Sequence, residues 1–267
     1  MIKSIFKVEK PVIGMLHLPA LPGSPRNTDD LAAIRAYVLR DAEALAEGSV
    51  DGLILENFGD SPFFPGRVPP HTVAFMAVLG QEVKARFPLP LGVNVLRNDG
   101  ISALAIAAAT GAAFIRVNIY TGARLTDQGV IQGEAHKVQR YRRLLGTGVK
   151  VFADVAVKHS APLAPRDLRA EVQDTLARGH ADAIIVSGSA TGEETQVEDV
   201  KLAKIHAGEA PVLVGSGVNL ETVEALLPHG DGFIAGTSLK TGGRTTHPVD
   251  RSRVSEFMAV VKRLRRA

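Results

Sequence analysis

The chain has no cysteine among its 267 residues, so neither a disulfide framework nor a zinc–thiolate site can form. It also lacks an apolar run long enough to cross a membrane. Its first residues, 1–6, have neither the apolar core nor the small-residue cleavage site of a secretory signal. These absences together predict a cytoplasmic protein.

The chain also lacks a large excess of charge of either sign, since it has 31 basic and 28 acidic residues and a formal net charge of +3. This balance argues against a nucleic-acid partner. The one basic cluster, 262–266, ends a predicted helix, where cations favour the helix dipole. That helix has an apolar face. Packing against the rest of the fold is the commoner use of such a face, so peripheral membrane contact is not favoured.

Short β-branched runs alternate with amphipathic segments along the whole chain. The expected strands are 12–16, 53–56, 92–96, 114–118, 149–155, 183–186, 212–214 and 233–235. Eight strand–helix repeats predict one domain over residues 1–267, closed as a (β/α)8 TIM barrel of the phosphate-binding type. An open doubly wound sheet is the rival fold, but the glycine-rich turn expected after its first strand is absent.

The loops that leave the predicted strands are long, whereas those that return to them are short. Examples of the long loops, which are rich in proline or glycine, are segments 17–25, 57–70 and 120–133. Long loops at one rim of a rigid scaffold are where function usually lies. Before the first long helix, Thr28 or Asp29 is the expected N-cap.

Three glycine-rich segments follow late strands, and we expect them to bind a phosphate. Glycine lets the backbone turn sharply and approach a ligand, and successive N–H groups near the start of a helix suit an anion. Ordinary tight turns are the alternative interpretation. The amides near Gly215, Ser216, Gly217, Gly236 and Thr237 are expected to hold the phosphate, and the further expected ligand-binding residues of these segments are Ser187, Thr191, Gly192 and Ser238.

Polar residues gather where five consecutive strands end, which predicts a charged barrel mouth and the default active site of this fold. We expect Asp154, Glu56, His17 or His159 to move protons, and Lys158 and Arg116 to stabilise negative charge. We expect three amides to orient hydroxyl groups of a ligand: Asn57, Asn94 and Asn118.

Two of these assignments leave alternatives open. A buried Arg116 needs a carboxylate, and Glu56 and Asp154 are the candidates, so a fixed ion pair competes with a catalytic role. Alternation places Lys158 on the same face as Asp154, where it could stabilise an oxyanion, contact phosphate or form a Schiff base. No cofactor is predicted, although Glu56, Asp154 and a ligand phosphate could together hold magnesium.

The same segments resemble the BtpA family over nearly the whole chain. The matching stretches are MLHLPALPG (15–23), LENFGDSPF (55–63), GVNVLRND (92–99), FIRVN (114–118), ADVAVKHS (153–160), VSGSATG (186–192), GSGV (215–218) and GTSLK (236–240). The resemblance implies a TIM barrel. The family is named for a cyanobacterial factor needed to accumulate photosystem I, and it includes members encoded beside sugar-uptake and phosphosugar genes.

These observations predict a barrel that binds a phosphorylated small molecule, either a sugar phosphate or a nucleotide-like phosphate. Acid–base chemistry at the mouth would make it an isomerase, a lyase or a hydrolase. A non-catalytic factor for photosystem I biogenesis or peripheral membrane assembly is the first alternative. A sensor that binds phosphate compounds without turnover is the second. We also expect a homo-oligomer.

Overall fold

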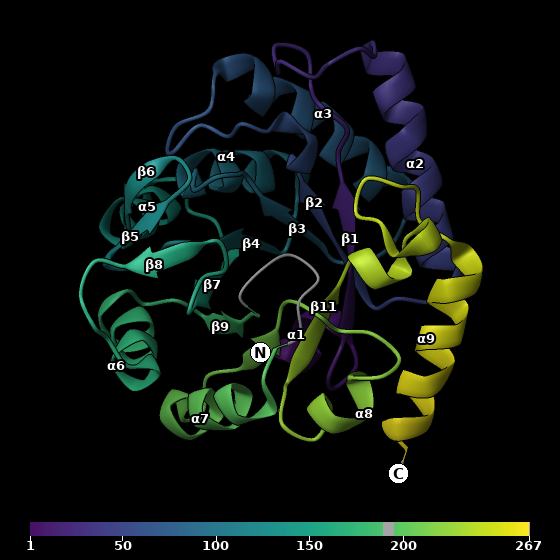
Figure 1. Ribbon diagram of the computed structural model, residues 1–267. Helices are drawn as coiled ribbons and strands as arrows, with labels where there is room; N and C mark the ends of the chain where they lie inside the picture. Colours follow the sequence, from purple (N-terminus) through teal and green to yellow (C-terminus); the bar gives the residue numbers. More distant parts are fainter. Residues whose placement is uncertain (189–194, 267) are drawn as a thin grey trace.

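Eight parallel strands close into a barrel in the computed structural model, which describes residues 1–188 and 195–266 (Figure 1). Their order around the barrel is β1-β11-β10-β9-β7-β4-β3-β2. Each overlaps a predicted strand, with ends that differ by one or two residues at most. The strands are β1 (Val12–His17), β2 (Gly52–Glu56), β3 (Leu91–Asn94), β4 (Phe114–Val117), β7 (Lys150–Val155), β9 (Ala183–Val186), β10 (Val212–Val214) and β11 (Gly232–Ala235).

The first and last strands pair with each other, and this closes the barrel. In β1, Ile13 lies opposite Ile234 of β11 and opposite Gly52 of β2. Buried strands of a parallel sheet are apolar on both faces because helices cover the outside and side chains fill the inside. The TIM-barrel prediction is therefore confirmed.

Helices surround the strands in a ring (Figure 1). The ring consists of α2 (Leu31–Glu47), α3 (Pro70–Arg86), α4 (Gly100–Thr110), α5 (Ala135–Leu144), α6 (Leu168–Gln173), α7 (Val197–Ala207), α8 (Val223–Leu226) and α9 (Arg251–Leu264), whereas α1 (Ile2–Phe6) lies inside it in this view. The N-cap expected for the first long helix was wrong. Asp30, not Thr28 or Asp29, caps α2, because its extended backbone lets Oδ1 accept the N–H of Ala33 at 2.8 Å.

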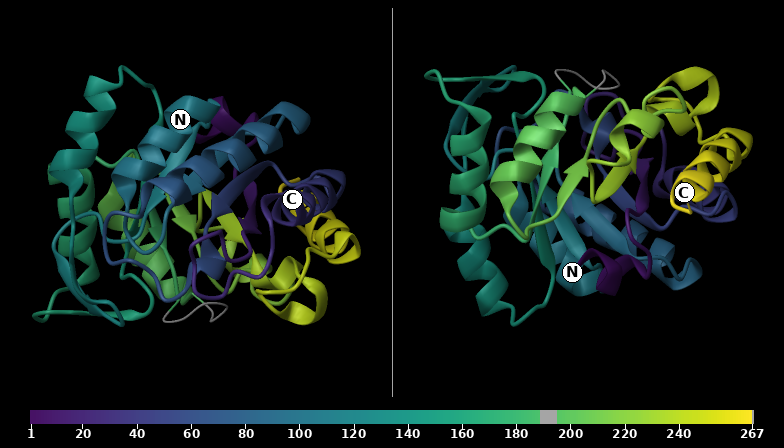
Figure 2. Two further views of the ribbon diagram at one scale, coloured as in Figure 1. Left: turned by 90° about the horizontal axis from the view of Figure 1, so that it is seen from above. Right: turned by 90° about the horizontal axis from the view of Figure 1, so that it is seen from below.

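Aromatic side chains fill the lower half of the barrel, by which we mean the half where the strands begin. The rings of Phe114 and Phe152 stack with centroids 4.6 Å apart, and Phe6 of α1 meets Phe114 edge-on at 5.8 Å. Helix α1 thus closes the end where the strands begin, and Figure 2 shows it opposite the end that carries segment 120–133. The other end of the barrel remains available for a site.

Segment 120–133, expected as a long loop, instead contributes strands to a small antiparallel sheet. Strands β5 (Ala123–Thr126) and β6 (Gly129–Gln132) form a hairpin, and β8 (Ser160–Pro162) pairs with the other side of β5. Gly129 turns the chain with a φ of +89°. The short connection and the apolar residues within each strand are a hairpin signal that the loop interpretation missed.

The helices of segments 1–188 and 195–266 include none with the length and apolar character needed to cross a bilayer.

Candidate active site

A cavity of about 230 Å³ opens at the carboxyl ends of the barrel strands. It brings together side chains from β1, β2, β4 and the turn after β7 with the two glycine-rich loops that follow β10 and β11. The predicted residues that line it are His17, Glu56, Arg116, Lys158, Gly215, Ser216, Gly217, Gly236, Thr237 and Ser238. Distant parts of the sequence therefore meet where the loops and the strand ends were expected to face each other.

The two glycine loops approach their neighbours too closely for a side chain. A Cβ on Gly215 would lie 2.4 Å from Cγ2 of Ile185, and one on Gly236 would lie 3.0 Å from Cε1 of His17. Gly217 has a φ of +64°, the left-handed region that glycine adopts readily. These positions need glycine to bring the backbone up to the cavity wall.

Several backbone N–H groups of these loops have no acceptor in the part of the chain that the structure describes. Among the described residues, nothing accepts a hydrogen bond from the N–H of Gly217, Gly236 or Thr237, whereas that of Gly215 donates to Val186 at 2.8 Å. The helix that follows β10 can contribute little to anion binding, because α8 has four residues and begins only at Val223. Any anion cradle here consists of loop amides, and Gly215 shapes it without donating.

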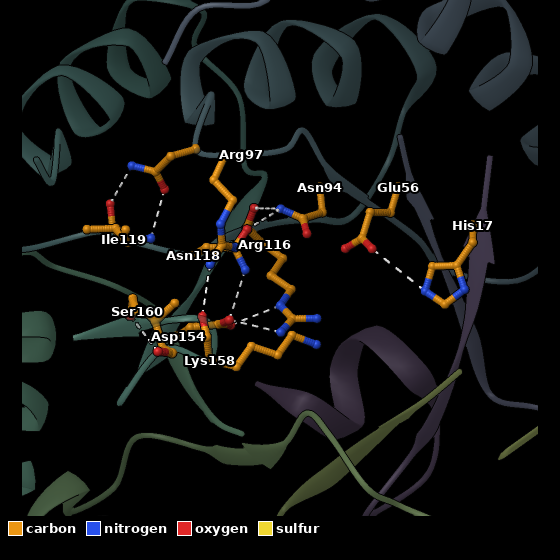
Figure 3. Close-up of polar contacts among 12 residues, drawn as sticks. His17, Glu56, Asn94, Arg97, Arg116, Asn118, Ile119, Asp154, Lys158 and Ser160 are labelled. Carbon is orange, nitrogen blue, oxygen red and sulfur yellow. Dashed lines mark hydrogen bonds and ion pairs between the residues drawn. The ribbon is translucent and has the colours of Figure 1, made fainter. Parts of the chain in front are cut away.

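Arg116 and Asp154 form a buried two-point ion pair inside the mouth (Figure 3). Nε and Nη2 of Arg116 donate to the two carboxylate oxygens of Asp154 at 2.9 and 2.8 Å. Burial opposes the charge of Arg116, but Asp154 prevails and raises the pKa of the guanidinium. Of the two candidate partners, Asp154 is therefore the one used. Arg116 lines the cavity and Asp154 does not.

The three predicted amides are bonded to protein rather than turned to the cavity. Asn118 donates to Asp154 at 3.0 Å and accepts from Asn94 at 3.2 Å, while Asn94 also donates to the carbonyl of Arg116. Asn57 accepts from the N–H of Leu96 at 2.7 Å. Asn94 and Asn118 therefore brace the strand ends that carry Arg116 and Asp154, whereas Asn57 braces the turn after β3.

His17 and Glu56 face each other from β1 and β2, with Nε2 and Oε1 3.7 Å apart (Figure 3). Burial lowers the pKa of His17 well below its usual value, and Lys240, Lys158 and Arg116 lower it further. Burial also raises the pKa of Glu56, against the opposing effect of Arg116. Nδ1 of His17 is buried and has no partner among the described residues. A neutral imidazole and a carboxyl group that holds its proton more tightly are suited to proton transfer.

Lys158 reaches the cavity through a turn and not, as expected, by strand alternation. Strand β7 ends at Val155, and Ala156 has a φ of +50°, so the alternation stops there. Glu171 accepts the N–H of Ala156 at 2.8 Å, and Nη2 of Arg97 donates to the carbonyl of Lys158 at 2.9 Å. Burial, with Arg116 nearby, lowers the pKa of Lys158 to about 8.

Besides Asp154 and the three amides, four more predicted site residues are not placed at this cavity. His159 is exposed and is absent from the lining. Ser187 is buried at the end of β9, and its Oγ has no partner among the described residues. Thr191 and Gly192 lie outside the described residues.

Sequence reasoning missed five residues that also line the cavity: Met15, Phe58, Val218, Asn219 and Ile234. Two of them had a usable signal. Met15 precedes His17 by two positions and Ile234 precedes Gly236 by two, so alternation along β1 and β11 places each on the inner face. Phe58 packs against His17 with ring centroids 4.9 Å apart, a contact that no sequence pattern indicates.

The magnesium set of Glu56, Asp154 and a ligand phosphate stays a prediction. Both oxygens of Asp154 are engaged by Arg116 and Asn118. No group of three histidine, aspartate or glutamate residues in 1–188 and 195–266 is arranged to hold a metal ion.

The closed parallel barrel, with a polar cavity at the carboxyl ends of its strands, defines a TIM-barrel protein. The chain belongs to the BtpA family, whose model matches residues 8–263. It is 46% identical to the photosystem I biogenesis protein BtpA of Synechocystis sp., over 95% of this chain and 88% of the relative. It is also 41% identical to an uncharacterized protein of Methanocaldococcus jannaschii, over 96% of this chain and 97% of the relative.

Among solved structures, the chain is similar to N-(5'-phosphoribosyl)anthranilate isomerase from Pyrococcus furiosus. The TM-score is 0.57, and the match covers 95% of this chain and 99% of the other. At 14% identity this likeness shows the fold alone.

Proposed function

We propose that this barrel is an enzyme that binds a phosphorylated small molecule in the cavity and moves a proton on it. One observation carries the proposal: the glycine loops after β10 and β11 and the ionisable side chains of β1, β2 and β4 line a single cavity. Late glycine loops are where barrels of this type hold a phosphate. The unused N–H groups of Gly217, Gly236 and Thr237 are the donors that such an anion needs.

The remaining groups suit acid–base chemistry on the bound molecule. Glu56 and His17 are the proton-transfer pair, since the first holds its proton more tightly than usual and the second is neutral. Arg116 offers a permanent positive charge to an anion formed in the reaction. Isomerisation, bond-breaking lysis and hydrolysis all use such a set, and sugar phosphates and nucleotide-like phosphates are the ligand classes of the proposal.

Thermal unfolding with and without ligand tests the phosphate site. Inorganic phosphate, sugar phosphates and nucleoside monophosphates are added singly, because a ligand that binds the folded state raises Tm by mass action. We expect at least one phosphorylated compound to raise the Tm of the wild type. Gly217→Asp should remove that response by placing a carboxylate at the cradle. Product analysis with the stabilising compound then measures turnover.

Gly111→Asp is the matched control, because Gly111 has a φ of +68° and ends α4 with open space around its Cβ position. It introduces the same residue at the same backbone conformation away from the cavity, and it should keep the ligand response. An unchanged response in Gly217→Asp would reject this loop as the phosphate site. Stabilisation without any product would favour the sensor alternative.

A role in photosystem I biogenesis is a second candidate, supported by the 46% identity to the Synechocystis protein of that name. The relative from Methanocaldococcus jannaschii is named only as an uncharacterized protein, so the similarity to it adds no support for this role. Flotation with anionic vesicles tests membrane association directly. Salt-sensitive flotation would support a peripheral assembly factor, and absence from the vesicle fraction would argue against it.

A further inference from the structure

Lys158 is the one group of the cavity whose chemistry the proton-transfer proposal leaves unused. We propose that its amine condenses with the carbonyl carbon of a phosphorylated aldehyde or ketone to form an imine. The inference rests on the proposed phosphate site and narrows its substrates to phosphorylated carbonyl compounds.

The first support is the absence of an ion-pair partner. Among the described residues, no carboxylate oxygen lies within 4.0 Å of Nζ of Lys158, because Asp154 is paired with Arg116 and Glu56 faces His17. Lys240, a fully buried lysine near the site, differs in this respect, since its Nζ donates to Asp41 at 2.8 Å. Lys240 is therefore held as a structural cation, whereas the amine of Lys158 is available to a ligand.

The second support is position. Lys158 lines the same cavity as Gly217 and Thr237, and its side chain runs beside the guanidinium of Arg116 (Figure 3). The Glu171 and Arg97 contacts on either side fix the turn that presents it. A molecule whose phosphate rests on the loop amides can therefore extend its carbonyl group toward the amine within about 230 Å³.

The surroundings of the amine raise the fraction of its neutral, nucleophilic form. Burial and the neighbouring guanidinium lower the pKa of Lys158 to about 8, although two carboxylates oppose the shift. At pH 7.5 about a quarter of such amines are neutral, against about a thousandth for an ordinary lysine. The charged and titratable groups that face it are His17 on β1, Glu56 on β2, Arg97 after β3, Arg116 on β4 and Asp154 on β7.

The step needs neither an oxidant nor a reductant. The nitrogen lone pair of Lys158 bonds to the carbonyl carbon, and the carbonyl oxygen takes a proton from the carboxyl group of Glu56. The nitrogen then returns a proton to Glu56. When the carbon–oxygen bond of this carbinolamine breaks, the oxygen takes that proton again and leaves as water. The imine nitrogen then passes its remaining proton to the Glu56 carboxylate, which restores the carboxyl group, so one amine and one carbonyl give one imine and one water.

Borohydride trapping tests the imine, because hydride reduces the carbon–nitrogen bond to a stable secondary amine. Wild-type protein is incubated with dihydroxyacetone phosphate, glyceraldehyde 3-phosphate or ribose 5-phosphate, treated with sodium borohydride and mapped by mass spectrometry. We expect one adduct per chain, on Lys158, with at least one of these compounds. Labelling by phosphate-free dihydroxyacetone should be at least tenfold lower.

Lys158→Arg keeps the charge but cannot form the adduct, and Lys150→Arg is the matched control at a lysine outside the cavity. Labelling in Lys158→Arg equal to that in the wild type would overturn the inference. Stabilisation of the wild type by these compounds without an adduct would overturn the imine and leave the phosphate site intact. If no phosphorylated compound stabilises the protein and none forms an adduct, both the imine and the phosphate site are rejected. Thermal melts of each variant confirm that it is folded.

Discussion

At the scale of single residues, Arg116 and Asp154 show how a charge is retained inside the barrel. Their side chains are nearly inaccessible to solvent, and two hydrogen bonds join them. A buried pair of this kind is costly to break because the remaining partner keeps its charge without compensation. The same pair leaves one nitrogen of Arg116, Nη1, outside the two bonds, so one side chain both completes the ion pair and lines the cavity.

Asp154→Ala should lower the free energy of unfolding by about 3–5 kcal/mol, since it leaves the Arg116 guanidinium buried and unpaired. Urea denaturation at pH 7 measures the loss. Glu9→Ala is the control, because the Lys3–Glu9 pair is exposed and should contribute less than about 1 kcal/mol. Equal losses in the two variants would contradict the buried-pair interpretation.

Lys158 predicts a pH dependence of stability. Its pKa falls from an ordinary 10.5 to about 8 in the folded chain, so between those values the unfolded state binds more protons. Stability from this group must then rise with pH from about 8 to about 10.5 and be constant outside that window.

Lys158→Met should remove this rise. Between pH 8 and pH 10.5 the free energy of unfolding of the wild type should rise by roughly 2 kcal/mol relative to that of the variant. This is somewhat less than the pKa shift would give in full, because the side chain is only partly buried. Urea unfolding of both proteins at pH 8, 9 and 10 measures it. Parallel curves for the two proteins would show that the pKa of Lys158 is not lowered.

At the scale of elements, the loop after β11 is tied to helix α2. Nζ of Lys240 donates to Oδ2 of Asp41, and Oδ1 of Asp41 accepts the N–H of Val249 at 3.1 Å. Both charged side chains are buried. One carboxylate on α2 therefore holds both ends of the segment that follows Thr237 and Ser238, two residues of the cavity wall.

Asp41→Leu and Lys240→Met should each destabilise the protein by about 3–5 kcal/mol, because each leaves an unpaired buried charge. The double variant should be less destabilised than the sum of the two, and this coupling identifies the pair. Urea unfolding of the wild type and three variants completes the cycle. Additive losses would mean that the two residues act separately.

The same element scale shows where sequence reasoning succeeded and where it failed. Buried parallel strands are short apolar runs, and their ends were found to within one or two residues. The hairpin of β5 and β6 was missed because half-exposed residues such as Leu125 and Val130 do not give the apolar pattern of the barrel. Within the site, the loop glycines were found from their positions after strands. The inward turn of Phe58 and the bonding of Asn118 depend on neighbours distant in sequence.

At the scale of the whole molecule, the two ends of the barrel differ: one is closed by packed side chains and the other carries the cavity. Helix α1 closes the lower end with Ile2 and Phe6, and the cavity occupies the upper one. In this fold, residues at the lower end affect stability whereas residues at the upper end affect function.

Phe6→Ala should therefore lower the free energy of unfolding by about 3–5 kcal/mol, the usual result of truncating a buried phenylalanine. Its ligand-induced change in Tm should match that of the wild type. Phe64→Ala, at a side chain that is 53% exposed, is the control and should change stability little. A lost ligand response in Phe6→Ala would mean that the two ends are coupled.

The contact between Phe58 and His17 has an optical consequence. The chain contains no tryptophan, so an indole placed at position 58 by Phe58→Trp would be the sole one in the molecule. Its ring would border the imidazole and the cavity at once. Fluorescence emission would then report directly, and in real time, whether the mouth of the barrel is occupied.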